Sequence, residues 1–171
     1  MTSHPSGSPG SLLTLGCVTA FATVLLTAPD PTAPDPDRAA SAGLWRVVAV
    51  EVNGQPVDSE ITAMLAVVYA VDGRWRVLFK SIAVAEGTSQ NDPTTTPKSF
   101  VMQTLGPADG SRPGDRYIGI YELCGDRRRF CFVPADAPRP GEFTSGRGSG
   151  RILVTLERPR PPVRGGGGGA G

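Results

Sequence analysis

The chain has 171 residues, and 17 basic against 16 acidic side chains give it a formal net charge of +1 at pH 7. Its basic residues form no stripe interleaved with aromatic side chains, so neither composition nor charge favours binding to nucleic acid or to an anionic membrane. The 22 glycines and 17 prolines concentrate toward the ends, which leaves residues 43–158 as a stretch long enough for one β-barrel or sandwich.

Residues 12–28 form an uncharged apolar run that stops at Pro29. This run is short for a membrane span and has the length of the apolar part of an export signal. We therefore expect an exported protein (periplasm, cell envelope or extracellular), with residues 1–28 as a signal peptide or a retained N-terminal anchor and no stable membrane span in the mature domain. No basic residue precedes the run, which leaves open the alternative of a tail with an accidental apolar run. Cys17 resembles a lipidation site only weakly.

Residues 29–42 are rich in Pro, Asp and Ala, which predicts an extended linker. A first strand is expected over residues 43–52. Because Val47 and Val48 interrupt its alternation, we expect either burial on both faces or a β-bulge there.

Turn and cap residues then divide the rest of the chain. Asn53-Gly54 predicts a turn, and Ser59 as N-cap predicts a short helix over residues 59–65. The other elements expected outside the hairpins are a strand at 82–85, a polar loop at 87–97, a strand at 100–105, a turn-rich loop at 107–114, an irregular segment at 134–150, a final strand at 152–157 and a disordered Pro/Arg/Gly tail at 159–171.

Residues 66–80 predict a hairpin around Asp72-Gly73. Pairing through a two-residue turn predicts one entirely apolar face, which should point inward. That face holds Ala66, Val68, Ala70, Trp75, Val77 and Phe79.

Residues 117–133 give the clearest hairpin, with Gly125-Asp126 as a two-residue turn. This register places Tyr121 opposite Phe130, and it predicts a face that carries Tyr121, Leu123, Phe130 and Phe132. Cys124 and Cys131 then lie four positions apart along the ribbon, roughly 13 Å. A disulfide needs Cα atoms within about 7 Å, so we predict that they are not bridged.

About eight short strands in meander order, with at most one short helix, predict an all-β, antiparallel, up-and-down barrel. The sequence also resembles the uncharacterised lipocalin-like domain found in many exported planctomycete proteins. The resemblance covers nearly all of residues 43–158 and rests on Gly43-Leu-Trp-Arg-Val-Val, Asn53-Gly54-Gln-Pro, Gly119-Ile-Tyr-Glu-Leu with Gly125-Asp126, Cys131-Phe-x-Pro, Pro138-Arg-Pro-x-Glu-Phe143 and Gly148-Ser-Gly150. It implies an exported lipocalin-like barrel with no established activity, and a ligand cavity by analogy only.

The Gly43-x-Trp45 pair also resembles the first-strand signature of lipocalins, in which the tryptophan closes the barrel base beneath a basic residue from the end of the last strand. Arg158 and Arg151 are the candidates for that residue, and the contact would be a cation–π interaction of about 0.5–2 kcal/mol.

The only histidine is His4, so residues 43–158 contain no imidazole for a catalytic triad or a His-ligated metal. We expect no enzyme activity and no cofactor. Glu122 is expected to pair with Arg129 across the hairpin, and Glu142 with Arg139. Arg127-Arg128-Arg129 is expected to be a solvated hairpin tip, with contact to an anionic polymer or a phosphate group as the alternative.

Five aromatic side chains expected to point inward are either core residues or the lining of a ligand site; they are Trp75, Phe79, Tyr121, Phe130 and Phe132. Small eight-stranded barrels are either filled with side chains or hold one small ligand, and the sequence does not decide between the two. We therefore expect a monomeric, non-catalytic domain that binds a small apolar or amphipathic molecule. The alternative is a structural or protein-interaction module of the cell envelope with a filled core.

Overall fold

The structure is a computed structural model that describes residues 35–106 and 113–160. The expectations for the export signal, Cys17 and most of the C-terminal tail lie outside these residues. No helix in the described ranges is long and apolar enough to cross a membrane.

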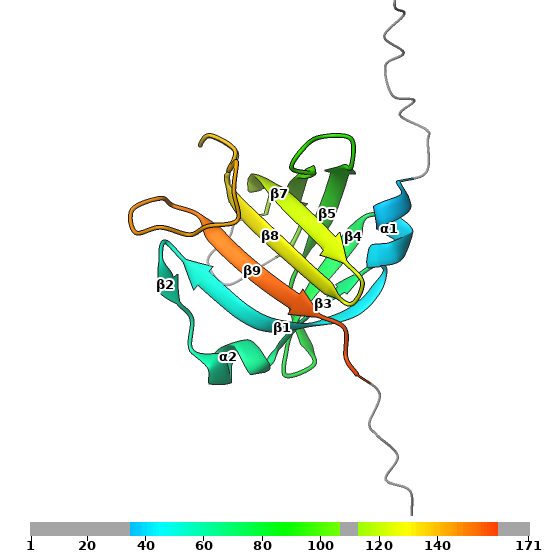
Figure 1. Cartoon of the computed structure of the whole chain (residues 1–171). Helices are drawn as coiled ribbons and strands as arrows, with labels where there is room; N and C mark the ends of the chain where they lie inside the picture. Colours follow the sequence, from blue (N-terminus) through cyan, green and yellow to red (C-terminus); the bar gives the residue numbers. More distant parts are fainter. Residues whose placement is uncertain (1–34, 107–112, 161–171) are drawn as a thin grey trace, which may run out of the picture. The chain divides into compact units, whose positions relative to one another are not determined.

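The strands close into a barrel (Figure 1), which confirms the all-β, antiparallel fold predicted from the sequence. Consecutive strands from β3 to β9 pair with each other, and β1 pairs with both β3 and β9, so that eight strands form a ring to which β2 adds as an extra short strand. The strands are β1 (Gly43–Val52), β2 (Gln55–Pro56), β3 (Leu65–Tyr69), β4 (Arg74–Phe79), β5 (Ile82–Asp92), β6 (Ser99–Thr104), β7 (Arg116–Cys124), β8 (Arg127–Pro134) and β9 (Ile152–Glu157).

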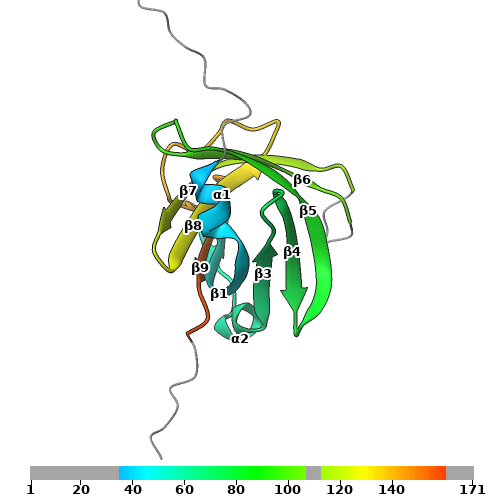
Figure 2. The same cartoon turned by 90° about the vertical axis from the view of Figure 1, so that its right-hand side faces the viewer.

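The barrel carries two short helices, one more than the sequence predicted, and the first of them lies across the end of the barrel that faces the viewer in Figure 2. Helix α1 (Pro36–Ser41) has Asp35 as its N-cap, so the prediction of an extended linker is wrong for this part of residues 29–42. Helix α2 (Ser59–Ala63) lies within the predicted helical segment, but its N-cap is Asp58 rather than Ser59. Both caps are aspartates whose carboxylates accept a backbone N–H of the first turn, which is the usual way such termini are stabilised.

The hairpin of β7 and β8 has the predicted register, with Tyr121 opposite Phe130 and Cys124 opposite Arg127. The predicted irregularity in β1 is also confirmed, because its pairing with β9 shifts between Val47 and Ala49. This bulge leaves Val48 exposed on the outside of the barrel.

The predicted register of the β3–β4 hairpin is wrong by one residue. Tyr69, not Ala70, lies opposite Trp75. The Ala70 carbonyl accepts the Gly73 N–H, and Gly73 adopts a φ of +88°, so the connection is a three-residue loop with Gly73 as an extra, bulged residue. A one-residue slip exchanges the two faces of a strand. The inward face of β3 therefore carries Leu65, Val67 and Tyr69 instead of Ala66, Val68 and Ala70.

The prediction of a polar loop over residues 87–97 is also wrong for its first half, because β5 continues to Asp92 and pairs with β6 as far as Ser99. The sequence did not indicate this part of the strand, because every residue from 88 to 92 is polar and the alternation of apolar and polar residues that is typical of a strand is missing.

The end of the barrel near α1 is closed by a tightly packed core around Trp45, which is fully buried. The indole N–H donates to the Ser41 carbonyl at 2.7 Å, and the Arg158 guanidinium carbon lies 4.4 Å from the ring centroid. Arg158 also donates to the carbonyls of Ala40 and Ala42, so it ties the end of the last strand to the C-terminus of α1. Arg151, the other candidate, contacts Glu142 and Thr144 instead.

Candidate ligand cavity

The barrel contains a cavity of about 600 Å³. This volume lies within the range of about 300–1,000 Å³ that is typical of small-molecule sites. The wall is mostly aliphatic and aromatic, and it consists of Val47, Val50, Val52, Val57, Ile61, Leu65, Val67, Tyr69, Trp75, Val77, Ala85, Ser89, Asn91, Phe100, Met102, Thr104, Tyr117, Phe130, Phe132, Ile152, Val154 and Leu156.

The cavity reaches solvent at the end that carries α2. Ile61 on α2 and Val52 at the end of β1 both line the cavity, and their exposed fractions are 46% and 42%. At the opposite end the wall includes Ser89 and Asn91, which lie near α1. The cavity therefore runs from an apolar mouth to a more polar closed end.

Two buried polar atoms of the cavity wall have no hydrogen-bond partner within the described residues. They are the indole Nε1 of Trp75 and the side-chain oxygen Oδ1 of Asn91. A buried polar group without a partner costs about 1–3 kcal/mol, and such groups are uncommon in native proteins. Both atoms belong to the deeper part of the barrel, where β4 and β5 approach the closed end.

Of the five aromatic residues proposed from the sequence, the structure brings three to the cavity wall: Trp75, Phe130 and Phe132. Tyr121 is buried in the closed end instead, and Phe79 is half-buried near the β4–β5 turn, outside the cavity lining. The sequence reasoning missed Tyr69 and Phe100, which pack against Phe130 with ring centroids 6.1 and 5.4 Å away. Tyr69 was missed through the register error in the β3–β4 hairpin.

A hydrogen-bonded cluster anchors α1 to the closed end. The Asp37 carboxylate accepts from Lys98 Nζ at 2.7 Å and from the Tyr121 hydroxyl at 2.8 Å. Burial on its own would raise the pKa of Asp37, but the hydrogen bonds from Lys98 and Tyr121 outweigh it and hold this pKa below its ordinary value. Burial, followed by the Asp37 contact, raises the pKa of the Tyr121 hydroxyl well above its usual range.

Arg128 contradicts the prediction of a solvated hairpin tip over residues 127–129, because its side chain is only 1% exposed. It lies on β8 opposite Leu123 and Leu156, on the same inward face as Phe130. Because residues two apart in a strand share a face, the alternation that placed Phe130 inward also predicted that Arg128 points inward.

The guanidinium of Arg128 sits among aromatic rings. Its central carbon lies 4.4 Å from the ring centroid of Tyr69, 4.3 Å from that of Phe130 and 5.6 Å from that of Tyr121. Two of its nitrogens, Nε and Nη1, are buried and have no hydrogen-bond partner within the described residues. Burial lowers the pKa of Arg128, although a guanidinium keeps its charge even when it is buried.

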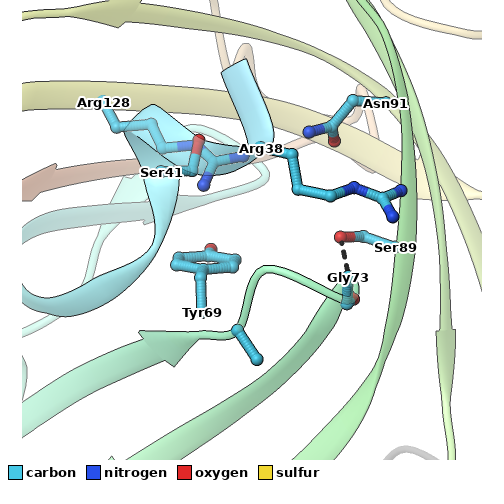
Figure 3. A pocket seen from close by; sticks show the side chains of 8 residues that line it. Arg38, Ser41, Tyr69, Gly73, Ser89, Asn91 and Arg128 are labelled. Carbon is cyan, nitrogen blue, oxygen red and sulfur yellow. Dashed lines mark hydrogen bonds between the residues drawn. The ribbon is translucent and has the colours of Figure 1, made fainter. Parts of the chain in front are cut away.

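A small pocket of about 10 Å³ lies beside this guanidinium (Figure 3). Arg128, Ser41 and Arg38 line it near α1, and the view shows Asn91 and Ser89 across from Arg128 with the Tyr69 ring below. Tyr69, Ser89 and Asn91 also belong to the wall of the large cavity, so the small pocket adjoins the cavity's closed end.

The two carboxylates singled out in the sequence lie outside the cavity wall. Glu122 forms the predicted ion pair with Arg129, at 3.1 Å. The predicted pairing of Glu142 with Arg139 is wrong, because Glu142 contacts Arg151 at 3.3 Å. Arg139 instead donates to the carbonyls of Phe100 and Gly119, where it fastens the loop after β8 to β6 and β7.

Cys124 and Cys131 are both free; Cys124 is exposed and Cys131 is buried. Within residues 35–106 and 113–160, no group of three or more His, Cys, Asp or Glu side chains is arranged to hold a metal ion.

Comparisons with known proteins give no relative for this chain: no family model, no curated protein and no solved structure matches it.

Proposed function

We propose that this protein is an exported, monomeric, lipocalin-like domain that binds one small apolar or amphipathic molecule inside its barrel, without catalysing a reaction. The observation that carries the proposal is the cavity of about 600 Å³ with its largely apolar wall. Burial of apolar ligand surface against such a wall is favourable at roughly 25 cal/mol per Å².

The alternative, a structural module with a filled core, fits this interior less well. Among the described residues, a buried core cluster includes Trp45, Phe100, Tyr121 and Leu156, and beside this cluster the interior holds the cavity of about 600 Å³. The mouth beside Ile61 gives a ligand a route into the remaining space.

Isothermal titration calorimetry with dodecan-1-ol, a neutral amphipathic probe, tests the proposal. We expect saturable binding of one probe molecule per barrel. Ala85→Phe, which projects a ring into the cavity from β5, should weaken binding about tenfold or more, the effect of losing about 1.4 kcal/mol of contact energy.

Val48→Phe is the matched control, because Val48 lies on the outer surface at the β1 bulge and is 43% exposed. It should bind the probe as the unaltered protein does. Native mass spectrometry of the protein from its own host would identify a co-purifying molecule. Failure of the folded protein to bind either dodecan-1-ol or dodecanoate would contradict the proposed function.

A further inference from the structure

At the closed end, one basic side chain has no acidic partner in contact with it among the residues that the structure describes. Lys98 pairs with Asp37 at 2.7 Å, and Arg38 pairs more loosely with Asp35 at 3.9 Å. Arg128, the most buried of the three basic residues, forms no ion pair with any described residue, and its surroundings are aromatic rings. The aspartates of α1 act on it only from a distance. A buried cation of this kind is stabilised most effectively by a directly bound anion.

The unpartnered polar atoms at this end are mainly donors. Three N–H groups have no acceptor among residues 35–106 and 113–160, namely Trp75 Nε1 and the Nε and Nη1 of Arg128. A carboxylate has two oxygens and about four lone pairs, and it can accept two parallel hydrogen bonds from one guanidinium. The remaining acceptor, Asn91 Oδ1, borders the small pocket, whose 10 Å³ is about the space of one water molecule.

We propose that Arg128 forms an anion subsite at the closed end of the cavity, and that the ligand is an apolar monocarboxylate whose carboxylate lies toward Arg128 while its apolar body fills the barrel up to the α2 mouth. This inference rests on the proposed function and specifies its ligand class. Arg128 lines the small pocket rather than the large cavity, so the carboxylate meets the guanidinium at the boundary where the two spaces adjoin, beside Tyr69, Ser89 and Asn91.

Three probes of equal chain length test the subsite on the unaltered protein: dodecanoate, dodecan-1-ol and dodecyltrimethylammonium. By calorimetry at neutral pH, dodecanoate should bind about ten- to a hundredfold more tightly than the alcohol, the effect of a hydrogen bond to a charged group. The cationic probe should bind most weakly. Equal affinities for dodecanoate and the alcohol would overturn the anion subsite while leaving the proposed function intact.

Substitutions then assign the preference to one residue. Arg128→Gln should lower the affinity for dodecanoate to that for the alcohol, with alcohol binding retained. Arg128→Lys keeps the positive charge and serves as a second variant in case the glutamine variant does not fold. It should retain part of the preference for dodecanoate over the alcohol, because a lysine ammonium cannot form the two parallel hydrogen bonds of a guanidinium. Arg127→Gln is the matched control, because Arg127 is the neighbour of Arg128 in the sequence and its side chain is exposed. This variant should bind the three probes as the unaltered protein does. Full dodecanoate preference in both Arg128 variants would refute the role of Arg128.

Discussion

Gly87 on β5 allows the indole of Trp75 to lie against the backbone of the barrel wall. A Cβ at this position would overlap both the Gln103 carbonyl oxygen and the Trp75 ring. Its backbone needs no unusual φ, so close approach rather than a turn accounts for the glycine.

We therefore expect Gly87→Ala to destabilise the protein by about 1–3 kcal/mol, the usual effect of overpacking. Urea unfolding followed by tryptophan fluorescence measures this change. Gly141→Ala is the matched control, because a Cβ there meets no atom within 4 Å, and it should leave the midpoint close to that of the unaltered protein. Equal midpoints for the two variants would show that Trp75 does not pack against Gly87.

At the scale of elements, α1 has six residues and depends on tertiary contacts, because an isolated helix of this length is not stable in water. The Asp37 carboxylate of this helix accepts hydrogen bonds from Lys98 and from Tyr121. Asn91 adds a second link through its hydrogen bond to Asp35. Helix α1 is thus held at the closed end by Asn91 of β5, by Tyr121 of β7 and by Lys98, which immediately precedes β6.

Asp37→Asn should lower the free energy of unfolding at pH 7 by about 1.5–3 kcal/mol, the range for hydrogen bonds to charged groups. The pKa of Asp37 is lowered in the folded state, so its contribution is fully present above its ordinary value of 3.8 and is lost as the pH falls through the lowered folded-state pKa. The difference between the variant and the unaltered protein should therefore shrink in acid.

Urea titrations at several pH values measure that difference. Asp126→Asn serves as the control, because this side chain is 86% exposed in its contact with Arg158 and should matter little at any pH. A difference for Asp37→Asn that persists unchanged in strong acid would mean that its charge does not hold α1.

Elements with an unambiguous local signal were predictable from the sequence. The two-residue turn at Gly125-Asp126 fixed the register of β7 and β8, and adjacent apolar residues at Val47 and Val48 signalled the bulge. The Asp72-Gly73 turn was ambiguous, because Asp-Gly suits both a two-residue loop and a three-residue loop with a bulged glycine. Local sequence alone does not choose between them; the packing of Tyr69 and Trp75 in the same interior does.

The candidate site was harder to predict because its polar part breaks the pattern on which strand prediction depends. Ser89 and Asn91 point into the barrel, so this half of β5 has polar residues on both faces and resembles a loop. Arg128 was missed for a related reason, since a charge run is ordinarily solvated. Both errors fall at the closed end, where the proposed ligand places its polar group.

For the molecule as a whole, a substitution that fills part of the largely apolar cavity should have opposite effects on the stability of the fold and on ligand binding. Wall atoms that face the cavity lack the packing partners that a filled core would supply. Filling part of the space with a larger side chain should therefore stabilise the barrel, and the same change should exclude ligand.

Val154→Ile on β9 adds one methylene group to the cavity wall while keeping the β-branched shape that suits a strand. It should raise the free energy of unfolding by about 0.8 kcal/mol, the value of one buried methylene group, and weaken dodecanoate binding. Val48→Ile, on the outer surface, should change neither quantity. Urea unfolding and calorimetry on the same samples measure both effects. A Val154→Ile protein less stable than the unaltered one would mean that the wall has no free space at β9, because an added methylene in a filled core causes strain instead of contact.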